Sequence, residues 1–303
     1  MPGLSDSLQA AKRRANRLGS LRQHPPRPLC VPARYFAEEP PKDAPTISIV
    51  TPSLNQGRFL EATVERVLRQ DYPALEYVIQ DGGSDDGTRA VIERYADRLH
   101  HWASQPDSGQ AQALNRGFAH TSGGVMSYLN SDDLLLPGAL AFVARFLTRN
   151  PQVDVVYGHR VLIDEAGQEI GRQVIPRHDD GVLSWADFIP QETVFWRRAS
   201  WEAAGARFDE SFRDAIDWDL LVRLRDAGAR MVRLPRFLGA FRVHGGQKTA
   251  VEGPTVGIEE MKRIRERLHG RPFSQKEVLR RVRWYLIRHV LLDRAYRLGL
   301  LRY

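Results

Sequence analysis

The apolar and polar positions of this chain change their period several times along its length. Residues 46–51 (TISIVT) form a β-branched run, and residues 57–70 then carry apolar side chains every three or four positions. The same alternation continues to residue 129, with further strand-like runs at LEYVIQ, LHHWAS and GVMSYL and helical segments between them. Repeated strand–helix units predict a mostly parallel, Rossmann-like sheet with helices on both faces, an α/β fold.

The second half of the chain predicts further elements at less regular spacing. A helix is expected from Pro137 to about Thr148, followed by a strand at VDVVYG. A hairpin is expected over residues 159–175, with its turn at Glu165 to Gln168. The remaining elements are a strand at ETVFWRR, an amphipathic helix at DWDLLVRLRDAG that Gly228 ends, and a late strand at FLGAFRVH.

Composition divides the chain into three parts. Residues 1–45 form a Pro-rich lead-in with 8 basic and 4 acidic residues, and residues 257–303 form a predicted helical extension with 13 basic and 5 acidic residues. Residues 46–256 between them are mildly acidic, with 23 basic and 28 acidic residues, and are long enough for one full core. Two basic arms on an acidic body point to an anionic surface that the chain ends contact.

The composition of the chain argues against several classes of protein. Cys30 is the single cysteine, so an intramolecular disulfide and a Cys-ligated zinc site are excluded. The basic residues Lys12, Arg13, Arg14 and Arg17 are not followed by an apolar segment, so the N-terminus does not resemble a signal peptide. No run of 18 apolar residues occurs, and a cytoplasmic location is expected.

Polar clusters follow three of the predicted strands: TPSLNQG, DGGSDDG and NSDD. Ligands of open α/β sheets bind beyond the carboxyl ends of the strands, so these clusters should converge. The adjacent Asp132 and Asp133 have two interpretations. They either cap the helix that starts near Pro137, although the register is poor, or they bind a divalent cation that bridges a diphosphate.

The other two clusters also have simple structural explanations. Asp81 ends a strand before two glycines, which suits an acceptor aimed at a base or ribose, but Asp-Gly sequences also favour turns. Asn55 is either a helix cap or part of a ligand loop. A G-x-G-x-x-G turn is missing after the first strand, and GGQKT has Gln247 where a P-loop needs glycine.

Asp217 and Asp219 begin the predicted helix in AIDWDLLVRL. Residues two positions apart diverge by about 200° on a helix, so the two carboxylates cannot share one task. Either both favour the helix N-terminus electrostatically, or one of them points into a cleft.

Taken in chain order, these segments resemble the family 2 inverting glycosyltransferases of the GT-A fold. The similarity spans about residues 46–250 and rests on TPSLNQGRFLEATVERVLRQ, QDGGSDDGT, DSGQAQALNRG, YLNSDDLLLPGAL, QETVFWRR, AIDWDLLVRL and AFRVHGGQKT. It implies a GT-A domain that moves a sugar from a nucleotide-sugar, usually a UDP-sugar, to an acceptor hydroxyl. Cell-surface polysaccharide or glycoconjugate synthesis is the implied setting, with a carbohydrate or lipid-linked acceptor.

The resemblance also assigns the metal site. NSDD occupies the place of the family's D-x-D motif, which makes Asp132 the implied ligand of Mg²⁺ or Mn²⁺. Asp133 lies beside it and is implied to contact the metal or the sugar of the nucleotide-sugar. Asn130 replaces the first acid of the motif. His244 sits where similar enzymes place a residue near the diphosphate and is a candidate third metal contact. The alternative for His244 is a surface histidine at a strand end.

Further positions carry over to the nucleotide-sugar and to catalysis. Asp217 matches the catalytic base, although Ile216 precedes it where the family often has Glu. Such a base is needed because an acceptor hydroxyl must lose its proton as it attacks. The implied nucleotide-sugar contacts are Pro52, Ser53 and Asn55 in the first loop, Asp81 at the base, and Gln110 and Asn115 over the sugar.

Two other functions compete with this one. A sugar-phosphate nucleotidyltransferase would need a glycine-rich, basic loop after the first strand, where this chain has one glycine and Arg58. A non-catalytic nucleotide- or carbohydrate-binding module is the third possibility, and the presence of both Asp132 and Asp217 argues against it.

The tail leaves two interpretations open. Val278, Leu279, Val282, Leu286 and Val290 fall on one broad helical face, with Trp284 and Tyr285 near it and arginines largely elsewhere. The helix either docks on the domain as ordinary core or lies on an anionic membrane surface. Nucleic acid is the least expected partner.

Overall fold

The computed structural model describes residues 23–247 and 253–303 of the chain. The basic residues between Lys12 and Arg17, and Lys248 and Thr249 of GGQKT, lie outside the described residues. The strands are β1 Ile47–Ser53, β2 Leu75–Asp81, β3 His101–Ser104, β4 Val125–Tyr128, β5 Leu134–Leu135, β6 Val155–Ile163, β7 Glu169–Gln173, β8 Phe195–Arg197 and β9 Met231–Arg242. The α-helices are α2 Gly57–Leu68, α3 Thr88–Tyr95, α4 Gln110–Phe118, α5 Ala139–Arg149, α6 Asp180–Leu183, α7 Arg198–Ala203, α8 Ile216–Asp226, α10 Ile258–His269 and α11 Gln275–Arg297.

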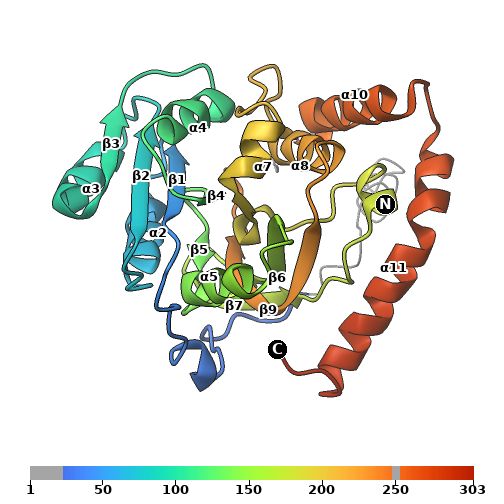
Figure 1. Ribbon diagram of the computed structural model, residues 1–303, viewed down its shortest axis with the longest axis horizontal. Helices are drawn as coiled ribbons and strands as arrows, with labels where there is room; N and C mark the ends of the chain where they lie inside the picture. The colour runs from blue at the N-terminus through green and yellow to red at the C-terminus, as the bar shows by residue number, and fades with distance from the viewer. Residues whose placement is uncertain (1–22, 248–252) are drawn as a thin grey trace, which may run out of the picture.

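One sheet runs through the molecule in the order β3-β2-β1-β4-β8-β6-β9-β5, with β7 paired to β6 (Figure 1). The first four strands are parallel, which confirms the βαβ pattern predicted for residues 46–129. β8 is antiparallel to both β4 and β6, and the predicted hairpin is β6–β7. Parallel pairing of β1 with β2 and β4 puts the carboxyl ends of these strands at one edge of the sheet.

The sheet is covered by helices on both faces, because side chains alternate along each buried strand. On β1, Val50 packs into a cluster with Leu114 of α4 and Leu221 of α8. Its neighbour Ile49 points the other way, into a cluster with Leu60 of α2 and residues of α5. The mixed α/β fold with a mostly parallel sheet therefore agrees with the prediction.

Residues 23–45 pack against the domain rather than standing free. Tyr35 is buried, and its hydroxyl accepts a hydrogen bond from the backbone N–H of Phe237 (3.1 Å). Arg236 of β9 pairs with Glu38 (2.7 Å), and Arg27 pairs with the buried Glu169 of β7 (2.6 Å). The described part of the Pro-rich lead-in is therefore held to the sheet by specific side chains.

Helix α10 supports the segment that leads into α8. The buried carboxylate of Glu260 accepts hydrogen bonds from the backbone N–H groups of Arg213 (2.7 Å), Asp214 (2.8 Å) and Ala215 (2.9 Å). These amides belong to the segment that leads into α8, which begins at Ile216 after its N-cap residue Ala215. A side chain from the C-terminal extension therefore holds the backbone of this segment in place.

Helix α11 docks on the domain with one face only. Val282 and Tyr285 belong to the same buried cluster as Leu114 and Trp218, and Val278 and Leu286 pack against it. Trp284 lies on the opposite side and is 67% exposed, so the expectation that it lies near the docked face was wrong. α11 runs along the outside of the molecule (Figure 1), and within residues 23–247 and 253–303 no helix is both long and apolar enough to cross a membrane.

The contact between Glu260 and this segment predicts a stability effect. Glu260→Ala leaves the buried N–H of Ala215 and the half-buried N–H groups of Arg213 and Asp214 without their acceptor, so the free energy of unfolding should fall by about 2–3 kcal/mol. The neighbouring Glu259→Ala is the control, because this side chain is exposed and lies 4.0 Å from Lys262. Urea unfolding of both variants measures the difference, and equal midpoints would contradict the supporting role of Glu260.

Candidate active site

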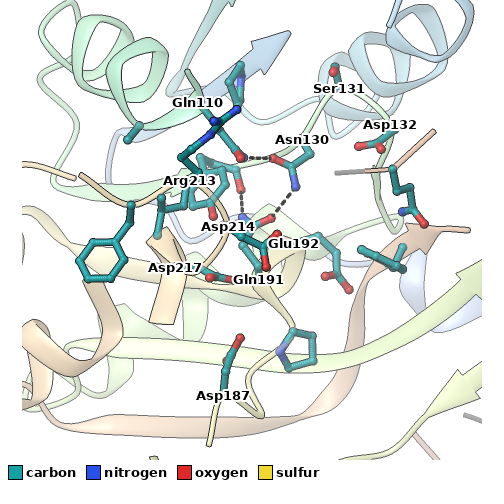
Figure 2. A pocket seen from close by; sticks show the side chains of 18 of the residues that line it. Gln110, Asn130, Ser131, Asp132, Asp187, Gln191, Glu192, Arg213, Asp214 and Asp217 are labelled. Carbon is teal, nitrogen blue, oxygen red and sulfur yellow. Dashed lines mark hydrogen bonds between the residues drawn. The ribbon is translucent and has the colours of Figure 1, made fainter. Parts of the chain in front are cut away.

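A cavity of about 630 Å³ opens where the polar clusters follow the parallel strands. Its walls include Pro52 and Ser53 at the end of β1, Asn130 to Asp132 after β4, and Asp217 at the start of α8. Figure 2 shows Asn130, Asp132 and Asp217 around one space, with Asp187 and Asp217 away from Asp132. Two of the three predicted clusters, TPSLNQG and NSDD, meet at this cavity, whereas DGGSDDG contributes none of its lining and contacts the first loop instead.

The first loop divides into cavity wall and scaffold. Pro52 and Ser53 line the cavity, and the hydroxyl of Ser53 is buried with no hydrogen-bond partner in the described part of the chain. Asn55 is outside the lining and has a left-handed backbone (φ 52°). Its side-chain oxygen accepts from the backbone N–H of Asp85 (3.1 Å), and its own N–H donates to Ser84 (2.8 Å). Asn55 therefore joins the first two loops, and it is not the cap of α2, which is Gln56.

Asp81 is fully buried at the end of β2 and does not line the cavity. It accepts hydrogen bonds from the hydroxyls of Ser84 (2.5 Å) and Ser104 (2.6 Å) and from the Ser84 backbone (3.0 Å). These bonds hold the loop after β2 to the ends of β2 and β3. In this arrangement the Asp81 carboxylate forms hydrogen bonds within the protein. To contact a nucleotide base, it would have to break its bonds with Ser84 and Ser104.

Gln110 and Asn115, both on α4, have different surroundings. Gln110 lines the cavity and donates to Asn130 (2.7 Å), which in turn donates to Gln191 (3.2 Å). Asn115 lies away from the cavity and exchanges hydrogen bonds with the backbone of Phe208 (2.8 and 3.0 Å). The structure thus brings Gln110 to the predicted site and gives Asn115 a role in holding the loop before α8.

The two adjacent acids after β4 point to different places. Asp132 lines the cavity and lies 3.0 Å from Nε2 of His244, which is buried at the end of β9. Asp133 is buried and accepts the backbone N–H of Arg242 (3.0 Å). Burial and the nearby Asp132 raise the pKa of Asp133 well above its ordinary value. Asp133 is therefore outside the cavity wall, and the expected metal or sugar contact is supported by geometry for Asp132 alone.

A divalent cation fits this end of the cavity through few protein ligands. The described residues, 23–247 and 253–303, contain no group of three His, Cys, Asp or Glu side chains that could hold a metal. Mg²⁺ and Mn²⁺ sites of this kind use one or two carboxylates and take further oxygens from substrate phosphates. Nδ1 of His244 lies 3.3 Å from Arg58, so in this arrangement Nε2 carries the proton and donates to Asp132. His244 would have to give up that bond to contact a cation.

Asp217 lies at the start of α8 on the other side of the cavity. Its Oδ1 accepts the backbone N–H of Trp218 (2.8 Å), and the residue is partly exposed toward the cavity. Burial raises the pKa of Asp217 to about 6. A carboxylate with this pKa is ionised at neutral pH and is a stronger proton acceptor than an ordinary aspartate.

Asp219 has the structural position that a diverging helix residue should have. It is fully buried and forms ion pairs with Arg223 of α8 (2.8 Å) and Arg267 of α10 (2.7 Å). Asp217 and Asp219 therefore point in different directions, as predicted: Asp217 faces the cavity, and Asp219 is buried between α8 and α10.

Several polar residues of the cavity were not singled out from the sequence, among them Asp187, Glu192, Asp214, Tyr285 and His289. Glu192 is buried and held by a two-pronged contact from Arg160 (2.9 and 2.6 Å). Asp187 follows Trp185 and Ala186 in an apolar stretch, and a lone acid there was the available signal. Tyr285 and His289 belong to α11, and nothing in its helical pattern connects them with the strand ends.

Residues 48–218 match the sequence model of glycosyl transferase family 2. An uncharacterized glycosyltransferase of Mycobacterium tuberculosis is 30% identical over 183 residues, 59% of this chain and 69% of the relative. A PGL/p-HBAD biosynthesis glycosyltransferase of the same species is 29% identical over 226 residues, 73% of this chain and 84% of the relative.

Solved structures with low sequence identity share the fold. Residues 1–349 of Staphylococcus aureus TarS in complex with UDP-GlcNAc superpose with a TM-score of 0.61 at 16% identity, covering 82% of this chain and 74% of that one. The mannosyltransferase PcManGT of Pyrobaculum calidifontis, in complex with GDP-Man and Mn²⁺, gives 0.57 at 18% identity and covers 98% and 89%. The match to a longer TarS structure spans 44% of that chain.

Proposed function

This chain belongs to glycosyl transferase family 2 and is a glycosyltransferase, and we propose that it uses a divalent cation to transfer a sugar with inversion from a nucleotide-sugar to an acceptor hydroxyl. One observation carries the proposal: Asp132 and Asp217 line opposite parts of one cavity. The family match removes the support for a nucleotidyltransferase or a non-catalytic module.

The donor binds, in this proposal, along the edge formed by the ends of β1 and β4. Pro52, Ser53 and Gln110 line that part of the cavity, and the unpartnered Ser53 hydroxyl is available to a ligand. We propose a UDP-sugar as the donor, as bound in the TarS complex, and a GDP-sugar, as in the PcManGT complex, is the alternative. Asp81 and Asn55 lie outside the cavity lining and stabilise these loops through hydrogen bonds with residues 84 and 85.

A Mg²⁺ or Mn²⁺ ion would be held by Asp132, with His244 as a second contact, and would supply positive charge beside the diphosphate leaving group. Asp132 is suited to this because its side chain opens on the cavity while that of Asp133 is tied to Arg242. Arg58, beside His244, adds a second positive group near the same place.

Asp217 acts as the base. Its carboxylate accepts the proton of the acceptor hydroxyl as the oxygen attacks the anomeric carbon from the side opposite the leaving group. A single displacement inverts that carbon, and the chain needs no nucleophile of its own. Since Glu260 fixes the start of α8, the position of Asp217 depends on the C-terminal extension.

We propose that the product belongs to cell-surface polysaccharide or glycoconjugate synthesis and that the protein works at the cytoplasmic side of a membrane. Relatives named for PGL/p-HBAD and for teichuronic acid biosynthesis support this biosynthetic setting. The outer face of α11 supports the location at a membrane. Trp284, Ile287 and Leu291 form an exposed apolar stripe at helical spacing, flanked by Arg280, Arg283, Arg288 and Arg294. An apolar stripe between arginines suits an anionic lipid surface.

The metal assignment predicts a binding defect. Asp132→Ala should weaken the Mn²⁺-dependent binding of UDP by about 10- to 100-fold, because the carboxylate ligand is lost. Isothermal titration with UDP, with and without Mn²⁺, measures this. Asp85→Ala, an exposed acid outside the cavity lining, is the control. Equal Mn²⁺-dependent affinity in Asp132→Ala would overturn the assignment.

The base assignment predicts a pH profile. Because Asp217 must be unprotonated and its pKa is about 6, kcat/KM should fall about tenfold for each pH unit below 6. Asp217→Asn should keep UDP binding and lose two to four orders of magnitude in turnover, roughly the size expected for a missing general base.

Asp219→Asn is the matched control on the same helix. Because Asp219 is buried between Arg223 and Arg267, this variant should lower Tm while the folded protein keeps its turnover. An inactive Asp219→Asn beside an active Asp217→Asn would reverse the two roles.

The membrane proposal predicts binding to vesicles. The protein should bind phosphatidylglycerol vesicles at low salt, release them at high salt, and bind phosphatidylcholine vesicles weakly. Trp284→Ala combined with Leu291→Ala should reduce this binding, and Ile258→Ala, an exposed apolar residue of α10, should not. Point variants are needed because deleting residues 257–303 would remove the buried Ile264, Val282 and Tyr285. Undiminished binding of the double variant would refute the proposal.

A further inference from the structure

The cavity extends past Asp217 into a region that the donor assignment leaves unused. The walls of this inner region come from the loop before β8 and from α11, and include Asp187, Phe188, Ile189, Tyr285 and His289. None of these residues belongs to the strand-end loops that hold the proposed donor. In Figure 2, Asp187 and Asp217 lie toward the lower part of the view, and Ser131 and Asp132 lie toward the upper right.

Two side chains of α11 form part of this inner wall. Tyr285 and His289 are one helical turn apart, 2% and 6% exposed, and both line the cavity. The Tyr285 ring lies 4.6 Å from the ring of Phe188, and its hydroxyl is buried without a hydrogen-bond partner in residues 23–247 and 253–303. A buried phenol usually finds a partner, so this hydroxyl is available to a ligand with polar groups.

Asp187 is the third polar group of the inner region. Its Oδ1 accepts only a long hydrogen bond from the backbone of Ile189 (3.4 Å) among the contacts that the described residues make with it. Burial and the carboxylate of Asp217 raise the pKa of Asp187 well above its ordinary value. The carboxyl group lines the cavity and has hydrogen-bonding capacity left for a ligand.

These groups have the chemistry of a sugar site. A sugar ring presents hydroxyls at its edge and C–H groups on its faces. Asp187, Tyr285 and His289 supply hydrogen-bonding atoms, and the Phe188–Tyr285 pair supplies an apolar wall. A mostly apolar wall with a few placed polar groups is the usual composition of a small-molecule site.

We propose that Asp187, Tyr285 and His289 form the acceptor subsite, and that they bind the sugar ring whose hydroxyl gives its proton to Asp217. The inference rests on the proposed transferase function and adds to it that the C-terminal helix selects the acceptor. The same helix then has two tasks on opposite faces, since Trp284 and Leu291 point away from the cavity.

The experiment separates acceptor binding from donor use. Hydrolysis of UDP-GlcNAc or GDP-Man needs the donor, the metal and Asp217, with water as the acceptor. Transfer to a panel of p-nitrophenyl glycosides adds the acceptor. Tyr285→Phe and His289→Ala should keep hydrolysis near the wild-type rate and raise the KM for the best glycoside by about tenfold each, as expected for one lost hydrogen bond. Trp284→Ala, on the outer face of the same helix, should leave both reactions unchanged.

A binding measurement covers a variant that folds poorly and does not depend on turnover. Saturation-transfer NMR of the glycoside, with UDP and Mn²⁺ present, should give a signal with wild type and Trp284→Ala and a much weaker one with the conservative Tyr285→Phe. Unchanged glycoside KM and unchanged NMR signal in both Tyr285→Phe and His289→Ala would overturn the subsite. Absence of donor hydrolysis in the wild type would instead refute the proposed function, so the two failures are distinguishable.

Discussion

Repulsion between carboxylates is the constraint on which the rest of this structure depends. Asp132, Asp187, Glu192 and Asp217 all line one cavity whose walls are largely buried. Charges placed this close in a low-dielectric site must be paired, protonated or offset by a ligand. The protein uses different solutions at different points: Arg160 pairs with Glu192, His244 contacts Asp132, and the pKa values of Asp187 and Asp217 are raised.

The distribution of these solutions divides the cavity by function. At the β4 end, the carboxylate of Asp132 faces the cavity, and a cation bound there would offset its negative charge. At the α8 end, burial gives Asp217 a pKa of about 6, which keeps it ionised at neutral pH yet receptive to a proton. Glycosyl transfer requires a positive group near the leaving diphosphate and a base near the incoming hydroxyl, and in the proposed function these two ends of the cavity supply them.

The C-terminal extension is the part of the chain whose role changes most once the structure is known. Glu260 holds the backbone just before α8, Arg267 pairs with Asp219, and Tyr285 and His289 line the cavity. An extension that looked separable by charge and composition therefore holds the proposed base in place. Seven of its 13 basic residues lie on α11, all at exposed positions, because the inner face of this helix is occupied by the core.

The sequence by itself determined the parallel half of the sheet, the hairpin, the family and the strand-end loops. These follow from local period and short motifs, as in TISIVT and NSDD, where neighbouring residues carry the information. It did not reveal that three predicted site residues form hydrogen bonds within the protein instead. Asp81 bonds with Ser84 and Ser104, Asn115 with Phe208, and Asp133 with Arg242. Nor did it bring Asp187, Tyr285 and His289 to the cavity. Those outcomes depend on which way a side chain turns at a strand end and on how a distant helix packs, and only the tertiary contacts decide both.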